Sequence, residues 1–239
     1  MKISYDLHIH TALSPCGHED MTPNNIVNMS KLCGVDVIAI TDHNTCENVE
    51  AVMKVALKSD LIVIPGMEIE SREEVHLVCL FPTLDQVQKV QAIVYSHLPN
   101  RPNNRKIFGE QILFNDEDDP IGTNNRLLSF ACDLSLEQVV QVCLDHDGVC
   151  IPAHIDRPSY SIISNLGMMP ENIDFPTLEI SRHNAIESYI KEYPNHQVIQ
   201  NSDAHDLGYI GSCKKTIDVS EKTLKAILTK LKSPNGTII

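Results

Sequence analysis

The chain has 239 residues, of which 42% are hydrophobic, and its formal net charge is −13 at pH 7. This composition suits one domain with a substantial core, and the acidic balance argues against a broad nucleic-acid-binding surface, which needs clustered lysine and arginine. No run of about 18 apolar residues and no apolar leader occurs, so we expect a cytoplasmic protein without a membrane segment. Eight cysteines without a CxxC pair indicate free thiols in a reducing compartment.

The first predicted element is a short strand over residues 5–11, which contains His8 and His10. Side chains alternate along a strand, so residues two apart point to the same side. The two imidazoles then stand about 6–7 Å apart and can close on one metal ion. The loop over 12–20 follows, and we do not count its Cys16 among the expected ligands.

Helices and strands alternate along most of the remaining chain. A helix over 22–34 has threonine and proline at its start and glycine at its end, as helix termini prefer. Further helices are predicted over 47–58, 85–95, 135–146 and 221–230, and strands over 35–40, 61–64, 75–81, 149–153, 177–180 and 197–200.

Residues 98–133 interrupt this alternation. The segment contains Pro99 and Pro102, several asparagines and the acidic run 116–119. Long connections of this kind are functional loops or solvated excursions. We therefore predict an inserted loop with little regular structure, which either covers the site or lies in solvent.

About seven repeats of strand and helix predict a parallel sheet within one domain over residues 1–239. No GxGxxG or GxxxxGK motif indicates a dinucleotide or P-loop site. Histidines and carboxylates instead follow the carboxyl ends of successive strands, and only a closed barrel brings so many strand ends to one centre. The predicted fold is a distorted (β/α)7 TIM-like barrel.

The candidate ligands are imidazoles and carboxylates, which suit Zn, Mn or Fe held for hydrolysis. Their number exceeds the needs of one ion and suits two or three divalent ions with a shared carboxylate. In chain order they are His8, His10, His43, Glu68, His76, His154, Asp203 and His205.

The order of the motifs DLHIHT, ITDH, GMEIE, IPAHID and NSDAH resembles the PHP (polymerase and histidinol phosphatase) family over nearly the whole chain. The resemblance implies a trinuclear metal site in a distorted seven-stranded barrel. It implies His8, His10 and Asp203 at a first metal, Glu68 as a bridge, and His76 and His154 at a second. His43 and His205 would hold the third, with His18 from the loop, or Asp20 as the alternative.

Further residues have expected supporting roles. Arg157, Arg182 and His183 follow strand ends, where an arginine suits a phosphate oxygen and a surface salt bridge is the alternative. Asp6 and Asp42 precede ligands and are expected to orient the imidazoles from behind. Glu70 could be either a ligand or such a supporting group.

The resulting hypothesis is a metal-dependent phosphoesterase in which metal-activated water attacks phosphorus, with Asp203 or His205 passing a proton to the leaving oxygen. The acidic, compact chain favours a small phosphomonoester or nucleotide over stable nucleic-acid binding. A 3′–5′ exonuclease and a non-catalytic metal-binding regulator are alternatives. A further alternative is the hydrolysis of C–N bonds by a similar metal-binding barrel. It is disfavoured because Glu68 stands where amidohydrolases tend to place a modified lysine. The sequence does not set the oligomeric state.

Overall fold

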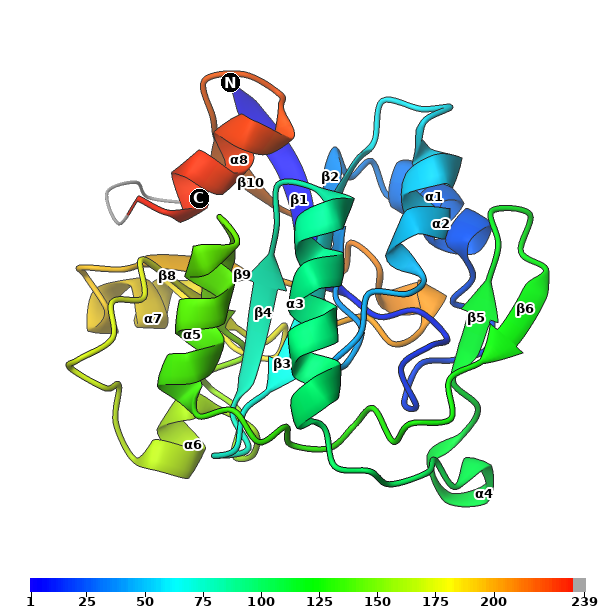
Figure 1. Cartoon of the computed structure of the whole chain (residues 1–239). Coiled ribbons are helices and arrows are strands. Elements are labelled where there is room, and N and C mark those ends of the chain that lie inside the picture. Colours follow the sequence, from blue (N-terminus) through cyan, green and yellow to red (C-terminus); the bar gives the residue numbers. More distant parts are fainter. Residues whose placement is uncertain (234–239) are drawn as a thin grey trace.

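The main sheet of the computed structural model, which describes residues 1–233, has the strand order β10-β1-β2-β3-β4-β7 (Figure 1). A separate parallel pair and a small hairpin complete the described strands. The bounds are β1 Lys2–Ile9, β2 Val37–Ile40, β3 Ile62–Glu70, β4 His76–Leu80, β5 Ile112–Phe114, β6 Pro120–Thr123, β7 Val149–Pro152, β8 Thr177–Ile180, β9 Gln197–Gln200 and β10 Lys215–Asp218.

The prediction of a parallel sheet is confirmed for β1, β2 and β3 and for the β8–β9 pair. It is wrong for β4, which pairs antiparallel with both β3 and β7, and β10 pairs antiparallel with β1. Only residues 71–75 separate β3 from β4. A connection this short cannot hold a crossover helix, so the second strand must return antiparallel.

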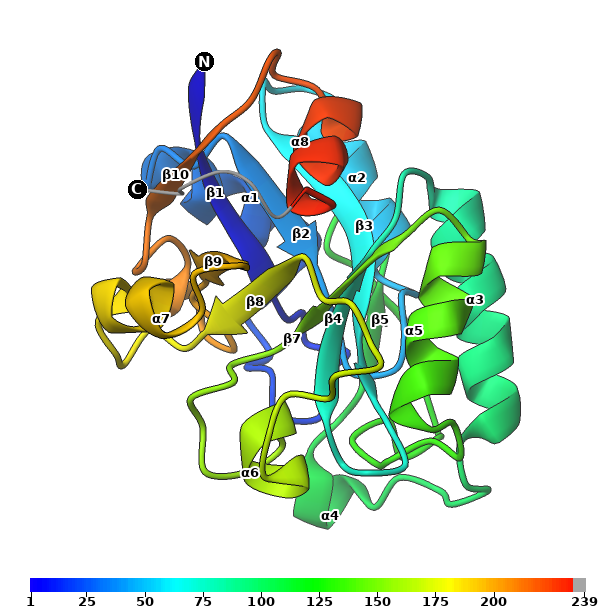
Figure 2. The ribbon, with the colours of Figure 1, turned by 90° about the vertical axis from the view of Figure 1, so that its left-hand side faces the viewer.

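Several helices begin at residues whose side chains cap the first turn. Thr83, Ser135 and Thr223 accept hydrogen bonds from backbone N–H groups at the starts of α3, α5 and α8. In Figures 1 and 2, α3 and α5 lie on the same outer side of the sheet. The bounds are α1 Pro23–Leu32, α2 Val49–Ala56, α3 Leu84–His97, α4 Arg105–Phe108, α5 Leu136–Asp145, α6 Ile162–Leu166, α7 Ile186–Glu192 and α8 Leu224–Leu231.

Two apolar clusters lie on opposite faces of the curled sheet. The inner cluster combines side chains of β1, such as Tyr5 and Leu7, with those of six other strands and of a single helix, α8. The outer cluster joins Ile38 and Ile40 of β2 to the apolar sides of the other long helices. Burial on both faces explains why the strands are almost continuously apolar.

The curled sheet forms a half-barrel, and the closed seven-stranded barrel that we predicted is not completed by strand ladders within residues 1–233. Between β9 and β1 there is one isolated bridge, Ile9 to Ala204, with His10 N–H donating to the Ala204 carbonyl at 2.9 Å. Between β7 and β8, Ile155 N–H donates to the Glu179 carbonyl at 2.9 Å. Both contacts lie just beyond strand ends, where polar residues replace the regular ladder.

The inserted segment over 98–133 contains more regular structure than we predicted. It forms α4 and the β5–β6 hairpin, whose turn is the acidic run over 116–119. Asn115 Oδ1 accepts N–H groups of Glu117 and Asp119, which closes the turn, and Asp118 adopts a φ of 67°. The Asp118 carboxylate accepts the Thr22 hydroxyl at 2.8 Å. The acidic run therefore works as a turn that docks on the start of α1.

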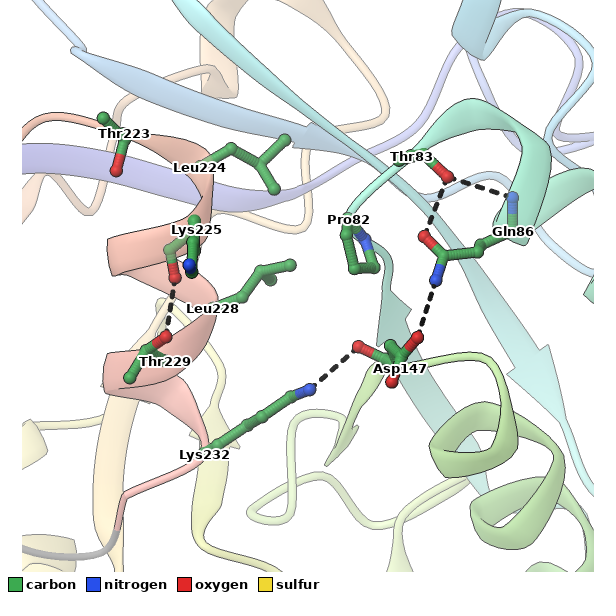
Figure 3. Close-up of a pocket in the computed structure, with 10 residues that line it drawn as sticks. All are labelled: Pro82, Thr83, Gln86, Asp147, Thr223, Leu224, Lys225, Leu228, Thr229 and Lys232. Atoms are coloured by element: carbon green, nitrogen blue, oxygen red, sulfur yellow. Dashed lines mark hydrogen bonds between the residues drawn. The ribbon is translucent and has the colours of Figure 1, made fainter.

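A hollow of about 740 Å³ lies between α8 and the start of α3. It is lined by apolar atoms such as those of Pro82 and Leu228, and the Lys232 ammonium donates to the Asp147 carbonyl at its edge (Figure 3). β4 begins at the predicted ligand His76 and runs away from it toward this hollow. The hollow is therefore at the far end of the sheet from the predicted site. Within the described chain, no helix has the length and apolar character needed to cross a membrane.

Candidate metal centre

A β-bulge near the end of β1 aims the first two histidines. Three steps along β1, from Asp6 to Ile9, match only two steps along β2, so the register shifts between them. Leu7 belongs to the inner apolar cluster, whereas Ile9 belongs to the outer one. A bulge of this kind redirects side chains beside functional sites. His8 and His10 consequently meet at the mouth of the half-barrel, while Asp6 points elsewhere.

The rings of His8 and His10 face each other through their Nε2 atoms, which are only 3.1 Å apart. His8 Nδ1 is 2.9 Å from Glu179 Oε1, and His10 Nδ1 is 2.9 Å from the Ser14 hydroxyl. These contacts occupy the Nδ1 atoms, so Nε2 of each ring is the atom that offers a lone pair to an ion once its proton has been displaced. Two buried acceptors directed at one point fit a shared cation, which is the typical arrangement of metal-binding histidines.

Glu68 on β3 is the central carboxylate of the site and is 1% exposed. Its Oε1 atom lies 3.0 Å from His76 Nδ1, 3.3 Å from His154 Nε2 and 3.4 Å from His8 Nε2. Its Oε2 atom lies 2.9 Å from His43 Nδ1. A carboxylate with imidazoles around both oxygens can bridge two ions.

Asp203 brings a second carboxylate to the opposite side of the cluster. Its Oδ1 atom lies 3.4 Å from His8 Nε2 and 3.3 Å from His10 Nε2, and Oδ2 lies 2.8 Å from Arg157 Nη2. The backbone of Asp203 has a φ of 50°, and that of His154 a φ of 31°. Left-handed conformations of residues with side chains are costly and concentrate at functional sites.

The buried side chains form three groups whose ligand atoms all lie within 4.8 Å of one another. The first holds His8, His10 and Asp203, the second His43, Glu68 and His76, and the third His10, His43 and His205. Buried ring atoms without hydrogen-bond partners include Nδ1 of His43 and of His154. Such orphaned polar atoms are costly unless a cation satisfies them, so the residues present fit divalent ions.

The structure does not bring His18 or Asp20 into these groups. The His18 side chain is 52% exposed, and its Nδ1 atom lies 3.5 Å from Asp20 Oδ2. Cys16, which we had set aside, instead contacts the rings of His43 and His205. Burial alone raises the pKa of the Cys16 thiol, but the charge of His43 and hydrogen bonds with the two rings lower it to about 6.

The carboxylates expected behind the ligands act indirectly. Asp42 accepts hydrogen bonds from the Thr11 N–H and from the Ser14 hydroxyl, and Ser14 in turn contacts His10. Asp6 accepts the N–H groups of Ser202 and Gly211, so it fixes the backbone before Asp203 and touches no imidazole of the cluster. Glu179, which our sequence reasoning did not select, is the carboxylate that contacts His8 at Nδ1, on the side of the ring away from the cluster.

The three residues expected at a phosphate have different surroundings. Arg157 is about one-third exposed and reaches the Asp203 carboxylate, so its guanidinium stands at the edge of the cluster. Arg182 donates to the Ser202 carbonyl at 2.6 Å and lies 4.0 Å above the Tyr209 ring. Arg182 therefore supports the loop that carries Asp203. His183 is exposed and belongs to none of the three groups.

Tyr160 is a further residue at the site that sequence reasoning missed. Its ring stacks on His76 with 4.9 Å between ring centroids, and it remains 48% exposed. Its backbone has a φ of 56°, and its carbonyl accepts the His76 N–H. An exposed aromatic ring next to the ligands offers a surface on which a substrate can stack.

The charges of the cluster predict that metal binding releases protons. Burial lowers the pKa of His8, but Glu179, Glu68 and Asp203 outweigh it and raise the pKa well above its ordinary value. The pKa of His76 is also raised, because Glu68 outweighs burial. A raised pKa means that these rings hold protons near neutral pH, and an ion must displace them.

We therefore expect the apparent affinity for Zn²⁺ to rise steadily from about pH 6 to about pH 8, with protons released on binding. Competition with a chromophoric chelator measures the affinity, and calorimetry in buffers of different ionisation enthalpy counts the protons. An affinity that does not change over this range would contradict the assignment of these rings as ligands.

A curled α/β sheet with histidine and carboxylate clusters at one end defines a metal-dependent hydrolase. A family model described as the PHP domain matches residues 6–202, and the chain belongs to this family of metal-dependent phosphoesterases. Our recognition of the family from the sequence motifs is thereby confirmed.

Solved structures with the same fold include the lesion-specific endonuclease Q of Pyrococcus furiosus, with a TM-score of 0.73 and 22% identity. An endonuclease Q complex with a 27-mer duplex carrying an abasic lesion has a TM-score of 0.72 and 21% sequence identity to this chain. These matches cover 100% and 99% of this chain and 58% of each endonuclease chain, so the protein spans little more than half their length. A metal-dependent phosphoesterase of Bifidobacterium adolescentis has a TM-score of 0.57 and 19% sequence identity. This match covers 85% of the present chain and 88% of the phosphoesterase.

An uncharacterized protein of Methanocaldococcus jannaschii is 30% identical over 94 residues, which are 39% of this chain and 12% of that protein.

The endonuclease Q structures contradict our expectation of a small phosphorylated substrate without stable nucleic-acid binding. That expectation rested on net charge, which counts every charged residue of the chain, whether buried or exposed. The structure shows that Glu68, Glu179 and Asp203 are buried in the cluster and do not face a partner.

Proposed function

We propose that this chain is a phosphoesterase that hydrolyses phosphodiester bonds of a nucleic acid with two or three divalent ions, Zn, Mn or Fe. The observation that carries the proposal is the convergence of six histidine side chains from distant parts of the sequence around Glu68 and Asp203. We assign His8, His10 and Asp203 to the first ion, His76 and His154 to the second, and His43 and His205 to the third, with Glu68 as the bridge.

When bound, the ions supply an activated water and neutralise charge on the phosphoryl group. The protein's own residues position the substrate. Arg157 can turn from the Asp203 carboxylate to a phosphate oxygen, which its planar guanidinium suits. His205 is about one-quarter exposed and its Nδ1 faces the Asp203 carbonyl, so its other ring nitrogen is the atom that would hold the third ion. With His205 and Asp203 engaged as ligands, the proton for the leaving oxygen would come from solvent.

The likeness to endonuclease Q supports a nucleic-acid substrate, and so does the surface beside the metal centre. Exposed cations gather at α4, namely Arg101, Arg105, Lys106 and Arg126, together with the exposed apolar side chains Ile107 and Phe108. In Figures 1 and 2, α4 and α6 lie at the end of the molecule toward which β1 runs, where the metal centre is. Ile112 N–H donates to the Ala12 carbonyl, which ties this segment to the loop after β1.

Metal-free protein supplied with Mn²⁺ or Zn²⁺ is expected to cleave labelled oligonucleotides, tested as single strands, intact duplexes and duplexes with an abasic site. Chelator should abolish cleavage. One discrete product indicates an endonuclease, and a ladder that shortens from the 3′ end indicates an exonuclease. No cleavage of any oligonucleotide with either ion, in protein shown to bind metal, would refute the proposed substrate.

Removing two positive charges from α4 is expected to weaken oligonucleotide binding and to reduce its salt dependence. Arg105→Ala with Lys106→Ala should lower the slope of log affinity against log salt by about 1 per lost phosphate contact. Lys225→Ala, an exposed lysine at the far hollow, is the matched control and should change nothing. Fluorescence anisotropy at several salt concentrations gives both values. Equal slopes for the wild type and the double variant would exclude α4 from the binding surface.

A further inference from the structure

The loop between β1 and α1 folds tightly over three of the ligands. Gly17 N–H donates to the Ser14 carbonyl, and His18 N–H donates to the His205 carbonyl, both at 2.8 Å. A side chain at Gly17 would collide with the Thr11 carbonyl oxygen, so this turn requires glycine. The backbone therefore fixes the two residues between Ser14 and Gly17 beside the ligand His205.

Cys16 occupies the inner side of this turn. Its thiol lies against the rings of both His43 and His205. One side of the thiol remains exposed to solvent, so it stands at the mouth of the centre. His18, two residues further on, turns outward to Asp20.

The group of His10, His43 and His205 lacks a negatively charged donor of its own. His43 is more than nine-tenths buried, and its Nδ1 atom makes no hydrogen bond although it lies 2.9 Å from Glu68. The short distance between His43 Nδ1 and Glu68, combined with poor hydrogen-bond geometry, indicates that the His43 ring is oriented to bind an ion and not to pair with Glu68. Three neutral imidazoles around one divalent ion would leave its charge uncompensated, unlike the other two groups, each of which contains a carboxylate.

We propose that Cys16 is a thiolate ligand of the third ion, which it holds together with His43 and His205. This inference rests on the proposed metal centre and replaces our expectation of His18 or Asp20 at this place. A nitrogen and sulfur donor set selects Zn²⁺, Co²⁺ or Fe²⁺ over Mn²⁺ and Mg²⁺, which prefer oxygen. The third site would then differ in metal preference from the two sites that contain Glu68 or Asp203.

The test compares Co²⁺-loaded wild type with Cys16→Ser, His18→Ala and Cys213→Ser. We expect a thiolate-to-cobalt charge-transfer band in the wild type, its loss in Cys16→Ser, and its retention in the other two variants. Elemental analysis after dialysis should find one zinc ion fewer per chain in Cys16→Ser only. X-ray absorption of the Zn²⁺-loaded wild type should show sulfur at about 2.3 Å, which decides the matter even if Cys16→Ser fails to fold.

Absence of a sulfur shell in the wild type, a band that persists in Cys16→Ser, or loss of an ion in His18→Ala would each overturn the assignment. The outcome is separate from that of the proposed substrate. Sulfur ligation in a protein that cleaves no oligonucleotide leaves the Cys16 assignment standing and removes the nucleic-acid substrate. Oligonucleotide cleavage without sulfur ligation does the reverse.

Discussion

Glu68→Gln is expected to lower hydrolysis by about 10³-fold or more and to reduce the number of bound ions. Both Glu68 oxygens contact imidazoles, with His43, His76 and His154 all within 3.3 Å. Burial raises the pKa of Glu68, but the charges of His76, His8 and His43 lower it well below its ordinary value. It therefore stays ionised, and glutamine offers neither that charge nor a second anionic oxygen for a bridge.

Glu70→Gln is the matched control because Glu70 lies two residues further along the same strand and is also buried. Its carboxylate reaches only the far side of His76, with 3.8 Å between Oε2 and Nε2. We expect its metal content to match the wild type and its activity to fall less than about tenfold. Steady-state rates with a labelled oligonucleotide, metal analysis and circular dichroism separate catalysis from folding. Comparable losses in both variants would show that Glu68 is not the bridge.

Much of the candidate site could be predicted because its histidines and carboxylates occur in short sequence motifs. His8 and His10, and likewise Asp203 and His205, stand two residues apart after buried strands, and the structure brings all four together. The half-barrel supplies the convergence, since successive strand ends meet at one mouth. Spacing and residue type were sufficient for these residues because each lies at a strand end whose position depends on apolar pattern alone.

The parts that sequence reasoning missed depend on local backbone geometry. The bulge in β1 leaves no mark in residue type, yet it separates Asp6 from the face that His8 occupies. The tight turn at Gly17 directs Cys16 inward and His18 outward, whereas counting along the loop favoured His18. The segment over 98–133 was predicted to have little regular structure because the role of its acidic run over 116–119 as a hairpin turn depends on the hydrogen bonds of Asn115.

Glu179 was not selected from the sequence, although a charged residue within a predicted buried strand indicated that it needed a partner. It lies in the otherwise apolar strand β8, is fully buried, and a buried charge in a strand requires a partner. Its Oε1 atom contacts His8 Nδ1 at 2.9 Å, and its Oε2 atom accepts the Asn201 amide at 2.8 Å. Asn201 in turn accepts the Leu7 N–H. One carboxylate therefore links β8, the loop after β9 and β1 where the strand ladders are interrupted.

Replacing Glu179 by glutamine is expected to weaken metal binding at the first site by about 10–100-fold while the fold persists. The carboxylate keeps the proton of His8 on Nδ1, so Nε2 stays free for the ion. Glutamine has nearly the same shape and can still accept one hydrogen bond. It lacks, however, the negative charge by which Glu179 raises the pKa of His8 and makes this ring a more basic ligand.

The expected pattern distinguishes orientation from simple loss of structure. In Glu179→Gln the affinity for Zn²⁺ falls and the proton release that accompanies binding decreases, because His8 loses a main cause of its raised pKa. Asn201→Asp tests the same link from its other end. Asn201→Asp places a second carboxylate beside Glu179 and should weaken the first site through repulsion. If Glu179→Gln binds Zn²⁺ with wild-type affinity and proton release, Glu179 joins strands and has no part in orienting His8.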